Sequence, residues 1–335
     1  MRSRFAFALS VALLLGVAVT GCGKRKAGEK SLTIAVIPQG STHEYWKSIH
    51  AGAMKAARDL AQKGTHVNII WKGPLREDDR EQQTQVVEGF ISQGVQGMVL
   101  APFDRRALVR PVEEAARAGI PTVIVDSDLD TPQIVSFIAT DNKKGGALAA
   151  DRMGELLHGR GKVLLLRYQE GSASTQAREE GFVERLKRAY PGIELISSNQ
   201  YAGPTRDTAK RASENLLTRY ADTIQGVFTP NESSTAGMLL ALQDIQRAGK
   251  IVFIGFDASD TFTGAMRNRQ LQGIVVQDPF RMGELGVRTM VDYLQGASVE
   301  KRVDTGATMI TPENLSSADA QRLLHPPLSK YLSGS

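Results

Sequence analysis

Short apolar runs alternate along the chain with segments of helical periodicity. Several runs are almost continuously apolar, which is typical of strands covered on both faces. The predicted strands cover residues 32–37, 66–71, 97–102, 121–126, 135–140, 162–167, 193–198, 226–231, 250–257 and 273–278. The predicted helices, with apolar residues three and four positions apart, cover 46–63, 80–93, 182–190, 207–220, 234–248 and 281–294. This alternation predicts an α/β protein with doubly wound parallel sheets.

Polar side chains follow many of the predicted strands at the point where each strand ends. Groups able to hydrogen-bond neutral hydroxyls stand at His43, Asp104, Asp126, Asn231, Asp257 and Gln277. Ligands of open α/β sheets bind outside the carboxyl ends of the strands. Each of these residues alone also fits a helix cap or a turn. Their recurrence in both halves of the chain favours a shared polar binding site.

The N-terminal segment has the pattern of a bacterial lipoprotein signal. Arg2 and Arg4 precede a short apolar run, and the segment ends in VTGC at residues 19–22. This resembles a lipobox, so we expect a signal peptide over 1–22, lipid attachment at Cys22 and a polar tether over 23–31. Alternatively, the N-terminal segment is not cleaved and itself anchors the protein, and the cysteine is incidental. Cys22 is the only cysteine, so the chain can form no internal disulfide.

The net positive charge of the chain arises in its first 30 residues. The formal net charge is +5, and residues 1–30 contain six lysines and arginines against one glutamate, so the remainder is neutral. A neutral body argues against a nucleic-acid partner, whereas a basic tether suits anionic lipid headgroups. About 300 residues beyond the tether exceed what one hydrophobic core usually holds, which predicts two domains.

Motifs for nucleotide, metal and catalytic chemistry are absent from the sequence. There is no Walker A sequence and no G-x-G-x-x-G after a strand, so we expect no nucleotide cofactor. The acids of 126–130 begin like a calcium loop, but the required glycine and glutamate do not follow, and we expect no metal. Asp126 and Asp257 leave a sugar-acting enzyme open as a minor alternative. The favoured prediction is a binding protein that is not an enzyme.

Seven blocks in order along the mature chain resemble the periplasmic sugar-binding proteins of the ribose-binding type. These proteins share their fold with the effector domains of lactose-repressor-like regulators. The matching blocks include GIPTVIVDSDL at 119–129, GSASTQAREEGF at 171–182, GVFTPNESSTAGMLLAL at 226–242 and VFIGFDASD at 252–260. No helix-turn-helix precedes the first predicted strand, so the resemblance favours the exported branch.

The resemblance implies two α/β lobes joined by three crossovers, near 140–141, 277–278 and 304–305. The first lobe would comprise 31–139 and 278–304, and the second 140–277 together with 305–335, a tail that matches the family less well. Such proteins capture one sugar between the lobes and close around it.

The resemblance also implies which residues contact the ligand. Tyr45 and Trp46 stand where family aromatics stack on a sugar ring, and His43 stands where a polar amide is usual. The full implied set is His43, Tyr45, Trp46, Asp126, Ser127, Gln176, Arg178, Asn231, Asp257 and Gln277. Ser127 replaces a family arginine, and a second family arginine falls on Gln176 with Arg178 two residues on. The family's aromatic on the far wall has no clear counterpart here, and the segment YAGPTRD at 201–207 offers Tyr201 or Thr205. These departures leave the identity of the sugar open.

The implied function is capture of a monosaccharide, such as a pentose, hexose or polyol, for delivery to an ABC-type permease. We expect a monomer held at the outer side of a membrane by its lipid anchor. A sensor receptor that signals to a chemoreceptor or a histidine kinase, with a sugar or an autoinducer as ligand, remains an alternative.

Overall fold

The structure is a computed structural model that describes residues 31–77 and 79–333. The expected signal peptide, nearly all of the expected tether and the lipidation site Cys22 lie outside the described residues. Residues from Ser31 onward pack as one compact unit. This unit contains two sheets, and we call the part built on each sheet a lobe.

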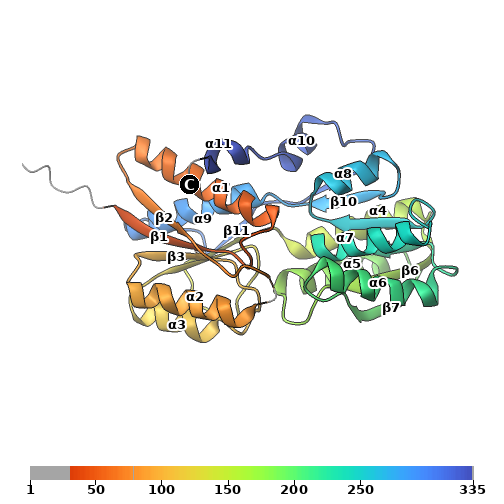
Figure 1. The fold of residues 1–335 in the computed structure, drawn as a ribbon, viewed down its shortest axis with the longest axis horizontal. Coiled ribbons are helices and arrows are strands. Elements are labelled where there is room, and N and C mark those ends of the chain that lie inside the picture. Colours follow the sequence, from red (N-terminus) through yellow and green to blue (C-terminus); the bar gives the residue numbers. More distant parts are fainter. Residues whose placement is uncertain (1–30, 78, 334–335) are drawn as a thin grey trace, which may run out of the picture. The chain divides into compact units, whose positions relative to one another are not determined.

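The first lobe is built on a six-stranded sheet in the order β2-β1-β3-β4-β5-β11, with every pair parallel. Its strands are β1 (Leu32–Ile37), β2 (Val67–Trp71), β3 (Gly97–Leu100), β4 (Thr122–Val125), β5 (Ser136–Ala139) and β11 (Arg302–Asp304). Its helices are α1 (Glu44–Gln62), α2 (Arg80–Gln93), α3 (Val109–Arg117) and α9 (Pro279–Leu294). Helices α1 and α9 cover one face of the sheet, and α2 and α3 cover the other (Figure 1).

The second lobe repeats this strand order as β7-β6-β8-β9-β10-β12. Its strands are β6 (Arg160–Arg167), β7 (Gly192–Tyr201), β8 (Gly226–Phe228), β9 (Val252–Phe256), β10 (Gly273–Val276) and β12 (Thr308–Ile310). Its helices are α4 (Asn142–Leu156), α5 (Ala173–Ala189), α6 (Arg206–Tyr220), α7 (Glu232–Asp244) and α8 (Asp260–Arg267). Helices α4 and α5 cover one face, and α6, α7 and α8 cover the other. Strand β12 alone is antiparallel to its neighbour.

Side chains of alternate residues along the inner strands enter the cores on the two faces of each sheet. On β1, Ile34 and Val36 face the core beneath α1 and α9, whereas Ala35 and Ile37 face the core beneath α2 and α3. All four side chains are buried. The almost continuous apolar runs of the sequence are therefore strands covered on both faces, and the predicted α/β class is confirmed.

The ten predicted strands are all present, and the structure adds two more. Strands β11 and β12 are three residues each, so they carry too little apolar pattern to be recognised. Helix α5 begins at Ala173, nine residues before the predicted start. Its first half is polar, and Ser174, Thr175 and Arg178 in it line a cavity between the lobes.

Glycines allow the helices on one face of each sheet to approach very closely. A Cβ atom on Gly52 of α1 would lie 1.9 Å from the carbonyl oxygen of Phe280. In the second lobe, a Cβ on Gly146 of α4 would lie 1.9 Å from the carbonyl oxygen of Arg178 on α5. Both contacts are with backbone atoms, which cannot move aside as a side chain can.

We expect Gly146→Ala to lower the free energy of unfolding by about 3 kcal/mol, because the added methyl group pushes α4 and α5 apart. The matched control is Gly264→Ala on α8, where a Cβ meets nothing within 4 Å. The control should be neutral or slightly stabilising. Urea unfolding of both variants measures the difference, and equal stabilities would contradict the close packing.

The chain passes between the two sheets at three places. These lie between β5 and α4, between β10 and α9, and between β11 and β12. The tail after β12 forms α10 (Ala318–Leu324) and α11 (Leu328–Leu332). Helix α10 packs on the core of the second lobe.

The end of the tail does not stay with the second lobe, to which 305–335 was assigned. Helix α11 packs against α1 of the first lobe. Arg58 donates hydrogen bonds to the carbonyl oxygens of Lys330 and Tyr331, at 2.6 and 3.1 Å. The Tyr331 ring is buried and lies 5.7 Å from the ring of Phe280. These contacts attach the end of the tail to the first lobe.

Candidate functional site

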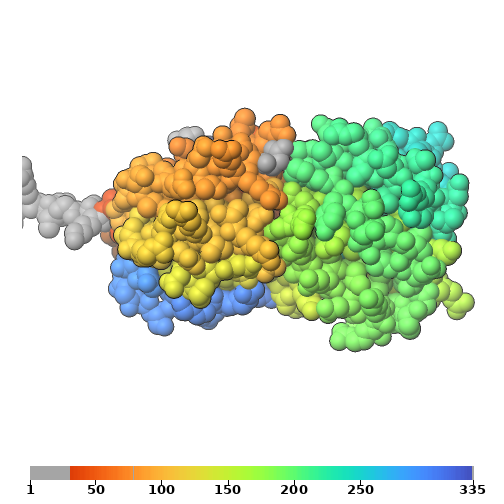
Figure 2. Space-filling view, turned by 90° about the horizontal axis from the view of Figure 1, so that it is seen from below, coloured from red at the N-terminus to blue at the C-terminus, as the bar shows by residue number. Residues whose placement is uncertain are grey.

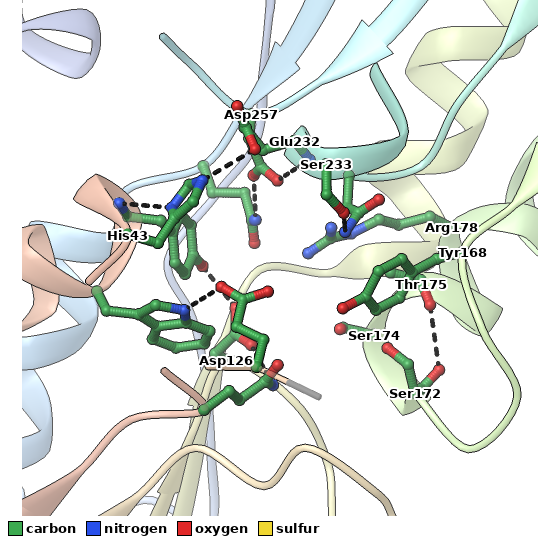
Figure 3. Close-up of a pocket in the computed structure, with 16 residues that line it drawn as sticks. His43, Asp126, Tyr168, Ser172, Ser174, Thr175, Arg178, Glu232, Ser233 and Asp257 are labelled. Carbon is green, nitrogen blue, oxygen red and sulfur yellow. Dashed lines mark hydrogen bonds and ion pairs between the residues drawn. The ribbon is translucent and has the colours of Figure 1, made fainter. Parts of the chain in front are cut away.

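A polar cavity lies between the two lobes, at the carboxyl ends of strands from both sheets (Figure 3). It holds about 440 Å³ of empty space, part of it open to solvent. Eight of the ten sequence-predicted ligand residues line it, namely His43, Tyr45, Trp46, Asp126, Arg178, Asn231, Asp257 and Gln277.

Two aspartates occupy equivalent positions in the two lobes. Asp126 follows β4 and Asp257 follows β9, and both have left-handed backbone conformations with φ of 65° and 68°. The Asp126 amide donates to the carbonyl of Ile138, and the Asp257 amide donates to that of Val275, so each residue is tied to the neighbouring strand. The repeated strand order of the lobes thus delivers one buried carboxylate to each side of the cavity.

Protein donors hold both carboxylates in place. Asp126 accepts from the Tyr45 hydroxyl at 2.5 Å and from the Gln39 amide at 3.3 Å. Asp257 accepts from the Gln277 amide at 2.7 Å and from the backbone amide of Glu232 at 3.0 Å. Burial raises the pKa of Asp126 to about 6 and also raises the pKa of Asp257. Each carboxylate has remaining acceptor capacity for ligand hydroxyls.

Arg178 is the buried cation of the cavity. Its Nε donates to Asn142 at 2.7 Å, one Nη donates to the carbonyl of Pro230 at 2.9 Å, and its guanidinium lies 4.0 Å from the Phe256 ring centroid. Over the part of the chain that the structure describes, no carboxylate lies within ion-pair distance of it. The guanidinium, which has five N–H donors in all, therefore has donors free for a ligand.

Two adjacent aromatic residues form the first-lobe wall. The Tyr45 and Trp46 rings are nearly perpendicular, at 84°, with centroids 5.0 Å apart. The Trp46 indole donates to Glu77 at 2.5 Å, and the ring also packs in the core of the first lobe. Burial raises the pKa of the Tyr45 hydroxyl well above its usual value, so this group stays a hydrogen-bond donor. The paired rings therefore present apolar surface with their polar atoms already fixed.

His43 and Asn231 line the cavity and also cap helices. His43 precedes α1, and its Nδ1 accepts from the Tyr45 amide at 3.1 Å. Asn231 precedes α7 and forms a capping box with Ser234. The alternative of helix capping therefore holds for both residues in addition to their place at the cavity. Gln277 differs, because its buried Oε1 has no partner among the described residues.

Two of the predicted ligand residues do not line the cavity. Ser127 is buried beside Asp126, and its hydroxyl accepts from the amide of Ser174 at 3.3 Å. Gln176 lies on the first half of α5 but outside the cavity lining, whereas Arg178, two residues on, is part of it. Tyr201 and Thr205 are likewise outside the lining, and Tyr168 supplies the aromatic ring of the second lobe.

Sequence reasoning missed half of the lining residues, which are Gln39, Glu77, Tyr168, Ser172, Ser174, Thr175, Glu232 and Ser233. Tyr168 directly follows β6, and Gln39 lies two residues after the end of β1, so both could have been expected from the polar residues at strand ends. Glu232 adjoins the predicted Asn231. Glu77 lies in the connection between β2 and α2, and no pattern in the sequence singles it out.

The two lobes contact each other on both sides of the cavity. His43 lies 2.9 Å from Glu232, the Arg105 amide donates to the carbonyl of Gly171 at 3.0 Å, and Arg80 donates to the carbonyl of Glu170 at 3.1 Å. The space-filling view shows the lobes meeting along a continuous boundary (Figure 2). The two lobes are therefore in direct contact around the cavity.

Other classes of site have little support in residues 31–77 and 79–333. No group of three or more histidine, cysteine, aspartate or glutamate residues within them is placed to hold a metal ion. No helix within these ranges combines the length and the apolar character needed to cross a bilayer. The arrangement offers fixed carboxylates, one arginine and flat rings, which suits a small ligand with several hydroxyl groups.

We expect the pKa of Asp126 to appear in the pH dependence of stability. Its pKa is about 6 in the folded protein against a usual value of 3.8. The folded protein binds the Asp126 proton more tightly than the unfolded chain does. The resulting contribution to the free energy of unfolding is therefore fully present below pH 3.8 and is lost as the pH rises through about 6. Relative to the unchanged protein, Asp126→Asn should therefore gain up to about 3 kcal/mol of unfolding free energy between pH 4 and pH 7. Urea unfolding across this range measures the gain, and a constant difference would contradict it.

Comparison with known proteins identifies relatives of the same architecture. The sequence profile of the periplasmic binding protein domain matches residues 34–298. The ribose import binding protein RbsB of Bacillus subtilis is 30% identical over 276 residues, which cover 82% of this chain and 86% of that protein.

Two solved structures show the same fold at 32% identity, each with a TM-score of 0.82. One is a carbohydrate transporter solute-binding protein of Agrobacterium radiobacter in complex with D-arabinose, matched over 88% of this chain and 99% of that one. The other is an ABC transporter solute-binding protein of Agrobacterium vitis with bound D-fucose, matched over 88% and 100%. These relatives are binding proteins and not enzymes. The chain therefore belongs to the periplasmic binding protein family, and its relatives are sugar-binding proteins of ABC transport systems.

Proposed function

We propose that this protein captures one monosaccharide between its two lobes and delivers it to an ABC-type permease. The observation that supports this most directly is the convergence of Asp126, Asp257 and Arg178 on one cavity from both lobes. Sugar hydroxyls need donors and acceptors at the same time, and an unpaired buried polar group costs about 1–3 kcal/mol. The fixed carboxylates, the free arginine donors and the unpaired Gln277 oxygen meet this need.

The aromatic wall supports a sugar rather than another polar ligand. The C–H groups on a sugar ring face are apolar and weakly positive, and they suit the negative face of an aromatic ring. Tyr45 and Trp46 line the cavity from the first lobe and Tyr168 from the second. Their rings would thus contact apolar parts of a ligand whose hydroxyls are bound by the charged groups.

The related solved structures indicate which sugars to test first. Relatives bind D-arabinose and D-fucose, and another is named for ribose import. A thermal-shift screen of pentoses, hexoses and polyols tests the proposal on the unit from Ser31 onward. We expect at least one monosaccharide to raise the melting temperature, and the absence of any shift across the panel would count against the function.

We further propose that the protein acts as a monomer at the outer side of a membrane, attached through lipid on Cys22. Lipid attachment keeps a receptor near its permease and raises its effective concentration there. Mass spectrometry of the membrane-extracted protein should show an acylated N-terminal Cys22, and Cys22→Ala should move the protein to the soluble fraction. A soluble unchanged protein would rule out the anchor.

A further inference from the structure

Both ring nitrogens of His43 are occupied by protein atoms. Nδ1 accepts the hydrogen bond from the Tyr45 amide, so the ring proton must reside on Nε2 in the neutral side chain. Nε2 lies 2.9 Å from Oε2 of Glu232 and donates to it. The imidazole therefore has no polar atom left for a ligand, although it lines the cavity.

The His43–Glu232 contact joins the two lobes. His43 immediately precedes α1 in the first lobe, and Glu232 is the first residue of α7 in the second. Figure 3 shows the two side chains directed at each other at the edge of the cavity, His43 from the first lobe and Glu232 from the second. We propose that His43 and Glu232 are positioning residues that form a latch, holding the lobes closed around the bound ligand. This inference rests on the proposed function and adds to it a role for two residues of the cavity rim.

The second-lobe half of the latch is held ready by Arg206. The Arg206 guanidinium donates Nε to Oε2 of Glu232 at 3.1 Å and an Nη to Oε1. Burial would raise the pKa of Glu232, but the hydrogen bonds and charges of His43 and Arg206 outweigh burial and lower it. Glu232 is thus an ionised acceptor fixed within its own lobe. Closure then needs only the approach of His43, because the Glu232 side chain is already ordered by Arg206.

Other charged groups also face His43. Burial and the charge of Arg206 lower the pKa of His43, but the hydrogen bond and charge of Glu232 and the charge of Glu77 outweigh them, so this pKa is raised. Protonation of Nδ1 would remove the hydrogen bond from the Tyr45 amide that caps α1. Nε2 carries a proton in both the neutral and the protonated ring, so it can donate to Glu232 in either form.

The latch is linked directly to the ligand walls at both ends. The backbone amide of Glu232 donates to Oδ2 of Asp257 at 3.0 Å. On the other side, His43 fixes the amide of Tyr45, whose hydroxyl donates to Asp126. Closing the latch thus places the two buried carboxylates on opposite sides of one ligand.

A double-mutant cycle on ligand release tests the latch. His43→Asn retains a side-chain oxygen that caps α1 but is too short to reach Glu232, and Glu232→Ala removes the acceptor. With D-arabinose as the probe, stopped-flow fluorescence should show each variant releasing ligand about tenfold faster, with the association rate nearly unchanged. The double variant should release no faster than either single one. Multiplied effects would show that the two residues act separately on the ligand and would overturn the latch.

The conservative variant Glu232→Gln separates a latch from a merely structural role. Its amide oxygen still accepts from Nε2 of His43, so it should restore slow release relative to Glu232→Ala. A release rate equal to that of Glu232→Ala would show that the charge toward Arg206, and not the contact with His43, matters.

The latch also has a readout that needs no ligand. Cys22 is the only native cysteine, so Arg110→Cys on α3 and Arg211→Cys on α6 place two spin labels on opposite lobes of the unit from Ser31 onward. Pulsed electron spin resonance on the ligand-free protein should show a larger population at long separation for His43→Asn and Glu232→Ala. If no monosaccharide binds, the proposed function fails and these distances alone decide the latch. Identical distributions in all variants would overturn it.

Discussion

Replacement of Arg178 by methionine is expected to weaken monosaccharide binding by about a hundredfold or more. Methionine retains much of the apolar volume against Phe256 but removes all the N–H donors of the Arg178 guanidinium. Truncating one partner of a buried, hydrogen-bonded charge typically costs about 2–5 kcal/mol, and each 1.4 kcal/mol is a tenfold change in affinity. The variant also leaves Asp126 and Asp257 without the nearby positive charge that lowers their pKa values.

Isothermal titration of the unchanged protein and Arg178→Met measures this loss. The matched control is Arg185→Met on the same helix, because Arg185 pairs with Asp151 at 2.6 Å and lies outside the cavity lining. The control should bind as tightly as the unchanged protein. Arg178→Met with undiminished affinity would remove the guanidinium from the ligand site.

The second large effect is expected for Asp257→Ala, which should weaken binding at least tenfold. The carboxylate accepts from Gln277 and from the Glu232 amide, so its loss removes one ligand acceptor and loosens two further parts of the wall. Its removal also relieves the cost of a buried charge, whose pKa is raised by burial. We therefore expect affinity to fall while the ligand-free protein stays folded.

Titration calorimetry and thermal unfolding together test this prediction. Asp222→Ala is a suitable control, because Asp222 is exposed and pairs only with Arg247 within the described residues. A fall in affinity with an unchanged melting temperature supports a ligand role. Simultaneous unfolding of Asp257→Ala would instead assign the carboxylate to the stability of the second lobe.

The fold could be predicted from the sequence because its strands are buried on both faces. Runs such as 97–102 and 121–126 need no tertiary information to be recognised, and strand ends then indicate the side of the sheet that binds ligand. The strands β11 and β12 escaped prediction because three residues cannot show a pattern. The course of α11 along α1 depends on contacts of Tyr331 that no local signal encodes.

The candidate site could be predicted only in part, because sequence places residues on elements and not their side chains in space. Asp126 and Asp257 follow strands, and the repeated topology brings them together. Gln176 and Arg178 are two residues apart on one helix, so they point in different directions, and only the structure shows which one faces the cavity. The inter-lobe role of Glu232 depends on its contact with His43, which the chain order does not reveal.

The central claim is that side chains from both lobes bind one monosaccharide together. Titration calorimetry of the best ligand from the screen, against the unchanged protein, Asp126→Asn and Asp257→Ala, tests this most directly. We expect one ligand per chain and at least a tenfold loss of affinity in each variant. Retention of full affinity by the variant of either lobe would show instead that one lobe alone holds the ligand.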